Sequence, residues 1–340
     1  MKKILLTIII LSCAIAESIA QDPNFSQFFA SPLTMNPAST GKFDGIFRVA
    51  GNYRNQWPTI NNAFTTSTVS VDFHLLKNSL AEIDRLGVGI LGFSDKNGNG
   101  ALSNNHFSLS TAYHKGLDED GLHQIGIGFQ GSYTDKRLDI SKLDFEDELT
   151  ALGFTGVTSE IFNQSDLSVK YFDLNAGVFY TGSSNGFSTY YIGASMYHIN
   201  RPKETFQGGE FYLNPRTTLQ AGARLPISSY NAVHLSANYS FQAQATNLMF
   251  GGAYAINLNS SDENPTNVYL GTWARFNNVT DAVIPYIGLE FGDLHFGATY
   301  DINISSLQAA SNLRGGAEIS LIYIKQPVNH DLKKLNCPKF

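Results

Sequence analysis

The sequence predicts an all-β fold, a transmembrane antiparallel β-barrel of the outer-membrane type with about 14 strands. Three observations predict it. Charged residues make up only 15% of the 340 residues, against roughly 25% in an ordinary soluble domain. Glycine (30 residues) and aromatic residues (12%) are both plentiful, which suits strands and tight turns. Apolar and polar residues also alternate along much of the chain, so each such segment presents two different faces.

The first 20 residues have the features of a Sec-type signal peptide. Lys2 and Lys3 form a basic start, residues 4–11 are apolar, and Ser18-Ile19-Ala20 supplies the small residues that precede a cleavage site. We therefore expect export, cleavage after Ala20 and a mature chain that begins at Gln21. Cys13 suggests an alternative, a lipid-modified cysteine, but Ile10-Leu11-Ser12 matches the required motif poorly. Cleavage would leave Cys337 as a lone thiol, so no internal disulfide is expected.

The alternating segments can be followed in order along the chain. In residues 232–241, for example, the odd positions are apolar and the even positions mostly polar. A water-soluble β-sandwich would alternate too. However, these segments exceed the usual five or six residues, and their polar faces carry Ser, Asn, Thr and Gly rather than Lys and Glu. The segments lie near residues 46–57, 64–76, 85–94, 104–116, 122–137, 170–182, 188–202, 212–227, 231–243, 246–258, 265–278, 282–291, 293–304 and 312–325.

This pattern divides the mature chain into three parts. Residues 21–44 precede the first strand, and Phe25, Phe28 and Phe29 among Pro and Asn suggest a packed, extended segment on the periplasmic rim or in the lumen. Residues 45–325 form the barrel. Because the strand number is even, both chain ends are expected in the periplasm, and residues 326–340 would form a periplasmic tail.

Two stretches of sequence are specific enough to suggest a family. The mature chain opens with Gln21-Asp22-Pro23-Asn24-Phe25-Ser26-Gln27-Phe28-Phe29, with Asn36-Pro37-Ala38 downstream, and the first strand closes with Gly51-Asn52-Tyr53-Arg54-Asn55-Gln56-Trp57-Pro58. Together they resemble the PorP/SprF family of outer-membrane proteins from type IX secretion and gliding-motility systems. Residues 94–103, 195–202 and 337–340 agree with this resemblance.

The resemblance implies a barrel in the cell outer membrane that serves an exported partner and performs no chemistry. Such a barrel would dock, anchor or help deliver a protein with a type IX C-terminal domain, for instance a large gliding adhesin. Its partners would be that protein, other type IX secretion components and outer-membrane lipid. The lumen or rim segment, residues 21–44, would then fix the barrel wall or contact the secretion machinery.

The candidate partner-binding or structural residues fall into three groups. Arg54 inside a barrel needs an acidic or carbonyl partner that the sequence does not identify. Trp57, at a strand end before Pro58, fits a structural role in an aromatic girdle. The acidic cluster in the longest loop could attract a basic partner or a divalent ion, although it is also typical of a solvated loop. The full set is Phe25, Asn36, Pro37, Tyr53, Arg54, Gln56, Trp57, Asp144, Glu146, Asp147 and Glu148.

Other function classes have weaker support. The net charge of −6 argues against a nucleic-acid partner. Residues 95–100 imitate the start of a calcium loop, but His106 stands where the required Glu would be, so a plain turn is expected. No catalytic, cofactor-binding or metal motif stands out, so we expect no enzyme. A barrel lipase stays open as a minor alternative, and a passive porin-like channel is the main one.

Overall fold

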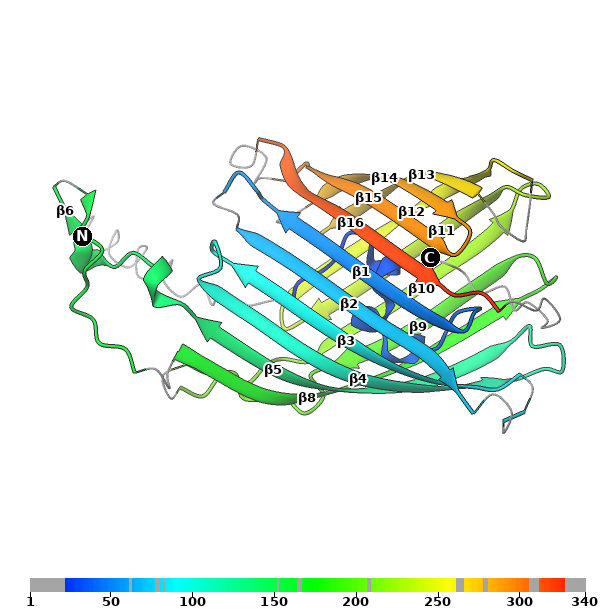
Figure 1. Ribbon diagram of the computed structural model, residues 1–340, viewed down its shortest axis with the longest axis horizontal. Helices are drawn as coiled ribbons and strands as arrows, with labels where there is room; N and C mark the ends of the chain where they lie inside the picture. The colour runs from blue at the N-terminus through cyan, green and yellow to red at the C-terminus, as the bar shows by residue number, and fades with distance from the viewer. Residues whose placement is uncertain are drawn as a thin grey trace, which may run out of the picture.

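The chain folds into a closed barrel of antiparallel strands, as the computed structural model in Figure 1 shows. Around the barrel, hydrogen-bonded neighbours follow the order β1-β16-β15-β14-β13-β12-β11-β10-β9-β8-β5-β4-β3-β2. The predicted class, an antiparallel barrel of 14 strands, is therefore confirmed. The structure describes residues 22–60, 63–76, 80–81, 83–151, 153–163, 167–206, 209–260, 266–277, 281–305 and 312–327.

The strands that form the barrel wall are β1 (Phe47–Gln56), β2 (Phe64–Leu75), β3 (Arg85–Asn97), β4 (Leu102–Gly116), β5 (Gln124–Leu138), β8 (Ser168–Ser183), β9 (Thr189–Tyr197), β10 (Arg216–Pro226), β11 (Ala232–Gln242), β12 (Ala245–Asn257), β13 (Thr266–Phe276), β14 (Ala282–Phe291), β15 (Leu294–Asn303) and β16 (Arg314–Ile324). The shorter elements are η1 (Phe28–Ala30), α2 (Pro32–Met35), η2 (Pro37–Ser39), η3 (Ile140–Lys142), η4 (Glu146–Glu148), β6 (Leu149–Thr150) and β7 (Gly153–Phe154). None of the helices in the described ranges is long and apolar enough to cross a membrane.

The two faces of the wall have the opposite polarity to those of a water-soluble sheet. In β2 the inward Thr68 and Asp72 are buried, while the outward Val69 is 56% exposed. Burial alternates along the whole of β14, again with apolar side chains outward. Exposed apolar side chains on the outside suit lipid, and polar groups on the inside need partners within the lumen.

Three strand ends differ by more than two residues from the sequence-based expectation. The strand expected from residue 212 begins only at Arg216. The segment expected to extend to residue 202 ends at Tyr197, because His198 and Arg201 adopt left-handed backbone conformations that a strand does not accommodate. Conversely, β3 continues to Asn97, and the expected turn begins only at Gly98.

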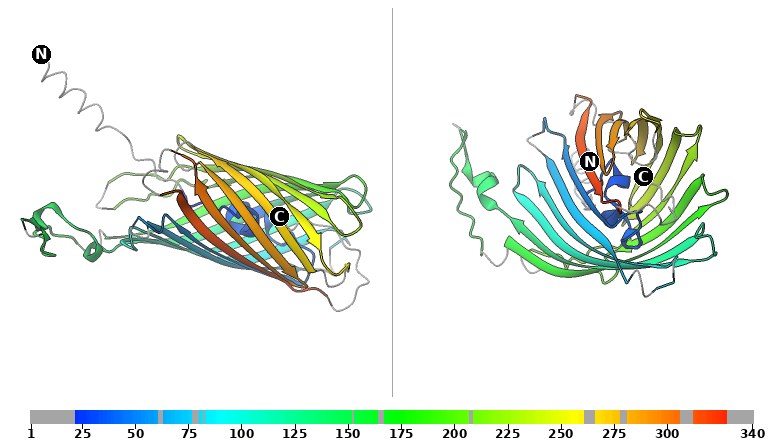
Figure 2. Two further views of the ribbon diagram at one scale, coloured as in Figure 1. Left: turned by 90° about the horizontal axis from the view of Figure 1, so that it is seen from above. Right: turned by 45° about the vertical axis from the view of Figure 1, so that its right-hand side comes forward.

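Residues 22–46, the lumen segment, run inside the barrel, where the blue trace of Figure 2 shows them. Where we expected an extended chain, η1, α2 and η2 shape it into three short turns. Pro32 and Pro37 each stand at the start of a turn, where the missing N–H is tolerated. The signal peptide, Gln21 and the tail from residue 328 onward, with Cys337, lie outside the described residues.

The lumen segment also changes where the N-terminal part of the chain lies. Asp22 contacts Arg216, the first residue of β10, and Gln242, the last residue of β11. These residues lie at the end of the barrel where residues 139–167 join β5 to β8, which we call the long-loop mouth. Ile324 ends β16 at the other end, the opposite mouth. The expectation that both ends of the mature chain share one side is therefore wrong for residue 22, because the chain before β1 threads back through the lumen.

Candidate functional site

The candidate site is the lumen segment together with the wall residues that hold it. Its first anchor is a buried charge cluster near the long-loop mouth. The Arg54 guanidinium lies 2.7 Å from an Asp301 carboxylate oxygen and 3.1 Å from a Glu318 oxygen. Arg275 lies 2.7 Å from the same Asp301 oxygen. The carbonyl or acidic partner expected for Arg54 is thus a pair of carboxylates from β15 and β16.

This charge cluster holds the lumen segment through hydrogen bonds. The backbone N–H groups of Ser26 and Gln27 donate to the two Glu318 carboxylate oxygens at 2.7 and 2.9 Å. The Ser26 hydroxyl donates to Asp301 at 2.7 Å and accepts a hydrogen bond from Arg54. Because a buried charge without such partners is costly, wall and segment stabilise each other.

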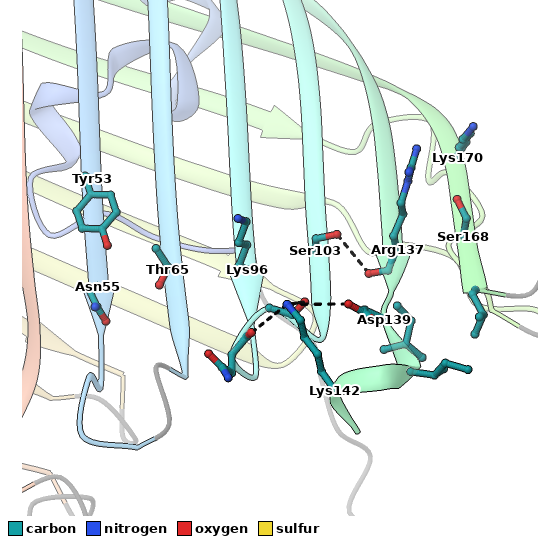
Figure 3. Close-up of a pocket in the computed structure, with 15 residues that line it drawn as sticks. Tyr53, Asn55, Thr65, Lys96, Ser103, Arg137, Asp139, Lys142, Ser168 and Lys170 are labelled. Atoms are coloured by element: carbon teal, nitrogen blue, oxygen red, sulfur yellow. Dashed lines mark hydrogen bonds and ion pairs between the residues drawn. The ribbon is translucent and has the colours of Figure 1, made fainter. Parts of the chain in front are cut away.

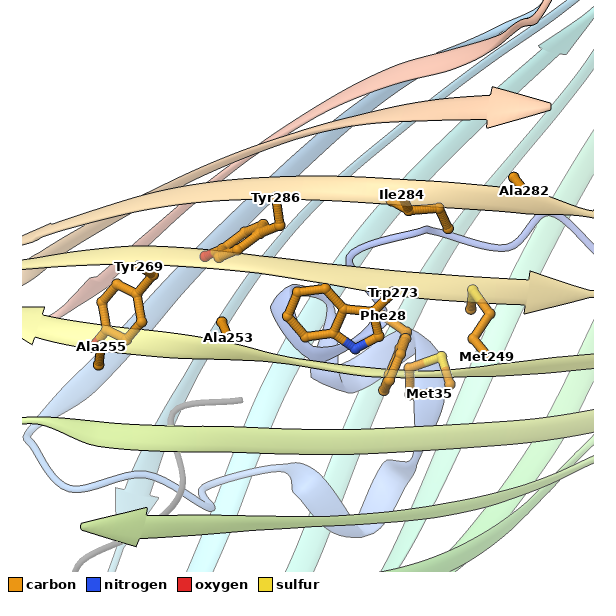
Figure 4. Close-up of a cluster of buried hydrophobic side chains, with 10 residues drawn as sticks. All are labelled: Phe28, Met35, Met249, Ala253, Ala255, Tyr269, Trp273, Ala282, Ile284 and Tyr286. Atoms are coloured by element: carbon orange, nitrogen blue, oxygen red, sulfur yellow. The ribbon is translucent and has the colours of Figure 1, made fainter. Parts of the chain in front are cut away.

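A second anchor is an aromatic and apolar cluster on the inner face of β12–β14, drawn in Figure 4. The Phe29 ring lies 4.9 Å from the Trp273 ring and 5.6 Å from the Tyr286 ring, measured between centroids. Phe28 and Met35 are buried in the same cluster. Phe25, a predicted site residue, is also buried, at 3% exposure. The phenylalanines of the opening sequence therefore give the segment an apolar core inside a polar lumen.

The third anchor is the Asn36-Pro37 pair, which packs against the glycine-rich inner face of β5 and β8. The Asn36 amide donates to the Val178 carbonyl at 3.0 Å, and its oxygen accepts from the Ala38 N–H at 2.9 Å. A Cβ at Gly128 would lie 2.4 Å from the Ala38 nitrogen, and one at Gly177 would lie 2.0 Å from the Asn36 oxygen. Only glycine at these strand positions leaves room for the segment.

A fourth anchor holds the last part of the segment before β1. Arg48 and Asp72 form a buried ion pair with an N···O distance of 2.8 Å. Asp72 also accepts from the Gly41 N–H at 2.8 Å, and Arg48 donates to the Ser39 carbonyl at 3.0 Å. The Arg48 guanidinium lies 5.0 Å from the centre of the Phe43 ring. Strands β1 and β2 thus bind the segment just before it enters the wall.

A histidine latch at the long-loop mouth fixes the start of the described segment. His198 Nε2 lies 2.8 Å from Asp22, and His198 Nδ1 lies 2.9 Å from Asp173. Burial alone would lower the pKa of the imidazole, but the two carboxylates raise that pKa to about 9. Burial would raise the pKa of Asp22, whereas His198 and Arg216 together lower it well below its ordinary value. His198 and Asp22 are therefore both charged at neutral pH.

The Asn52–Pro58 motif divides between the two faces of β1. Asn52 and Arg54 are buried on the lumen side, and Gln56 accepts from Arg54 at 3.3 Å. Tyr53 points outward and is 44% exposed. Trp57 follows the strand in a left-handed conformation, and its ring packs edge-on against Phe64 at 5.4 Å. The motif combines a lumen anchor, an outward aromatic residue and a strand end.

The acidic cluster lies in the long loop, which extends well beyond the barrel wall in Figure 1. Asp147 accepts from the Thr158 hydroxyl at 2.8 Å and from the Ser159 N–H at 2.5 Å. Bonds from the Ser159 N–H and hydroxyl, and then from Thr158, lower the pKa of this carboxyl. Glu148 is buried, while Asp144 and Glu146 are exposed. Asp147 therefore shapes the loop, and it is also exposed to solvent together with Asp144 and Glu146.

Sequence reasoning identified Arg54 but missed the residues that surround it, namely Arg275, Asp301 and Glu318. A signal existed, because each charge stands at an inward position of a strand that is almost free of other Asp, Glu, Lys or Arg residues; the one exception is Arg314 at the start of β16. The described residues contain no group of three His, Cys, Asp or Glu side chains placed to hold a metal ion.

Comparison with known proteins places the chain in a family. The family model for the type IX secretion system membrane protein PorP/SprF matches residues 17–323. The chain is therefore an outer-membrane β-barrel and belongs to the PorP/SprF family of type IX secretion system membrane proteins, as the motifs indicated. No curated protein matches the chain.

Solved structures show the same kind of barrel at low identity. The CymD monoaromatic hydrocarbon channel is 10% identical, with a TM-score of 0.50 over 88% of this chain and 94% of CymD. The Pseudomonas putida toluene transporter TodX is 9% identical, with a TM-score of 0.48 over 86% of this chain and 92% of TodX. CdiB from Acinetobacter baumannii is 8% identical, with a TM-score of 0.44 over 82% of this chain but only 59% of CdiB. These likenesses concern the fold alone.

Proposed function

We propose that this barrel docks, anchors or helps deliver an exported protein through that protein's type IX C-terminal domain, and that it does so without catalysis. The observation that carries the proposal is the occupied lumen. The lumen segment contacts opposite sides of the wall, from Glu318 on β16 to the Val178 carbonyl on β8. A barrel filled by its own chain suits a binding scaffold better than a conduit for solutes. Membership of the PorP/SprF family supports the link to type IX secretion.

The long loop supplies a surface on which a partner could dock. Its chain closes on itself through Asp147 and through the Phe145 and Phe162 rings, whose centres lie 5.3 Å apart. Yet Val157 is 75% exposed and Ile161 is 91% exposed. A structured loop that presents large apolar side chains beyond the barrel rim has the character of an interaction surface.

The test is affinity purification of the barrel from mildly solubilised outer membrane, followed by mass spectrometry. We expect a large exported protein with a type IX C-terminal domain to co-purify in near-stoichiometric amount. The variant V157S/I161S should lose it. The control I227S/L258S removes two apolar side chains of comparable exposure, 62% each, at the opposite mouth and should retain it.

The alternative, a passive porin-like channel, requires an open path through the lumen. If the protein is such a channel, the wild-type barrel should purify alone and conduct ions steadily in planar bilayers. That outcome would contradict the docking proposal. If V157S/I161S retained the partner, the docking proposal would still hold, but the binding surface would lie outside the long loop.

A further inference from the structure

An outward-facing hollow lies at the rim of the barrel near the long-loop mouth, with a volume of about 990 Å³ (Figure 3). We call it the rim hollow. The strands that form it lie between the viewer of Figure 3 and the lumen segment, which appears behind them. The residues that line it include Tyr53, Asn55, Thr65, Lys96, Ser103, Arg137, Asp139, Lys142, Ser168 and Lys170.

Strand register shows that this hollow belongs to the outer surface. Asn55 pairs with Thr65, Thr65 with Lys96, and Lys96 with Ser103. The same row continues from Ser103 to Arg137 and from Arg137 to Ser168. The neighbours of these residues along each strand, such as Arg54 and Asp95, are buried toward the lumen. Because side chains alternate along a strand, the whole row points away from the lumen.

The row stands where the lipid-facing part of the wall ends. Along β4, β5 and β8 the outward side chains change from apolar to polar toward this mouth. The apolar ones are Phe107 and Leu109, Phe129 and Tyr133, and Phe172 and Leu174, all exposed. The polar ones that follow are Asn105 and Ser103, Asp135 and Arg137, and Lys170 and Ser168. A barrel wall changes in this way where acyl chains give way to headgroups.

The charges of the hollow are mostly positive and only partly compensated. Arg137 pairs with Asp135, and its Nη2 lies 2.6 Å from a carboxylate oxygen. The single lining carboxylate, Asp139, accepts from the Ser141 N–H and hydroxyl at the start of η3. Lys96 and Lys170 are exposed, and neither forms an ion pair within the described residues. The net charge of the chain is −6, yet Lys96, Arg137, Lys142 and Lys170 surround one hollow at the membrane boundary. Lys170 stands opposite Asp135 in the β5–β8 pairing and interacts with it electrostatically, so Arg137 and Lys170 share one carboxylate.

We propose that the rim hollow binds the phosphate-bearing headgroup of a glycolipid in the outer leaflet of the membrane. The positive charge of the hollow favours an anionic ligand, and its position next to the apolar, lipid-facing wall favours a ligand with acyl chains. The volume suits a sugar headgroup rather than a lone inorganic anion. Long loops of such barrels face the cell exterior, so the leaflet at this mouth is the outer one. Lys96 and Lys170 supply cations that form no ion pair within 4.0 Å among the described residues. The hydroxyls of Ser103 and Ser168 would turn to the phosphate from the Arg137 carbonyl and the Asp135 carboxylate, to which they donate at 3.5 and 3.4 Å.

Native mass spectrometry of the full-length barrel, titrated in detergent with a bisphosphorylated lipid A, tests the proposal. Each lysine near a membrane surface contributes about 1 kcal/mol to the binding of anionic lipid, so K96Q/K170Q should weaken binding roughly 10-fold to 30-fold. The control K115Q/K325Q removes two lysines from the opposite mouth and should bind as the wild type does. Heat-modifiable gel migration checks that each variant is folded.

Three further arms identify the ligand. Dephosphorylated lipid A should bind the wild-type barrel at least tenfold more weakly, and inorganic phosphate at millimolar concentration should not displace the phosphorylated lipid. Equal binding of the two lipids, or displacement by phosphate, would overturn the proposal, the latter in favour of a small-anion site. The proposal would also be overturned if K96Q/K170Q bound the lipid as the wild type does but lost the exported partner. The hollow would then be a binding site for the exported partner.

Discussion

Arg54 and Asp301 lie 247 positions apart in the sequence, yet their side chains meet in the lumen at 2.7 Å. Arg54 belongs to β1 and Asp301 to β15, with β16 between them. The contact therefore exists only because the barrel closes between its first and last strands. Ser26 of the lumen segment sits on the same two side chains. Closure of the wall and occupation of the lumen are thus coupled through a single charge cluster.

This coupling predicts that Arg54→Gln destabilises the barrel and loosens the lumen segment together. Removal of one member of a buried ion pair typically costs about 3–5 kcal/mol, because the remaining charge stays buried without its partner. We expect a lower temperature for the heat-induced shift in gel migration and a rise in single-channel conductance in planar bilayers.

Arg224→Gln is the control for this prediction. Arg224 lies toward the opposite mouth and donates to the Phe187 carbonyl at 3.3 Å, at an exposed site. It should change neither property. If Arg54→Gln lowered stability but left conductance at the wild-type level, the charge cluster would hold the wall alone and not the segment.

The inward glycines predict a second, independent effect on the lumen segment. In Gly128→Ala the new methyl group would lie 2.4 Å from the Ala38 nitrogen, so the segment must shift. Overpacking of this kind costs about 1–3 kcal/mol. We expect faster proteolysis of the native barrel within residues 22–46 and a lower unfolding temperature.

Gly92→Ala is the matched control, since a Cβ there meets Val69 at an ordinary 3.7 Å on the outward face. It should leave proteolysis unchanged and stability equal to or slightly above that of the wild type. Equal proteolysis of the two alanine variants would contradict a segment packed against β5.

The strands of the barrel wall could be predicted from the sequence because residues that face lipid alternate along each strand with residues that face the lumen. In β14, apolar Val283, Ile287 and Leu289 face outward, and this spacing is visible without any structure. The end of β9 could not be predicted in the same way. Residues 198–202 continue the polar and apolar mixture, and it is the left-handed backbone of His198 and Arg201 that stops the strand.

The candidate site was harder to predict, because its contacts depend on the register between β1 and β16, the two strands that close the barrel. Arg54 stands directly opposite Glu318 in the β1–β16 pairing. That pairing joins the two ends of the wall, and no local pattern encodes it. Asp22 and His198 present the same difficulty. Their contact requires the lumen segment to start at the long-loop mouth, which the even strand number alone does not suggest.

The His198 latch predicts a pH dependence of stability. The latch raises the pKa of His198 from 6.5 to about 9, so the folded protein holds a proton that the unfolded chain releases near pH 6.5. The extra stability is therefore complete below about pH 6.5 and is lost as the pH rises through about 9. A shift of this size corresponds to roughly 3 kcal/mol. Unfolding temperatures measured from pH 6 to pH 10 should fall across this window.

The variant His198→Gln separates the latch from every other titrating group. It should be less stable than the wild type at pH 6 and show little further loss up to pH 9, since Asp22 and Asp173 then lack a titratable partner. His123→Gln, at the opposite mouth, should keep the wild-type profile. The latch is excluded if His198→Gln and the wild type lose stability in parallel across this window. If the unfolding temperatures of His198→Gln and the wild type instead converge above pH 9, His198 holds the start of the lumen segment by its charge. Above that pH the imidazole is uncharged, so the imidazole and the glutamine amide interact with Asp22 in nearly the same way.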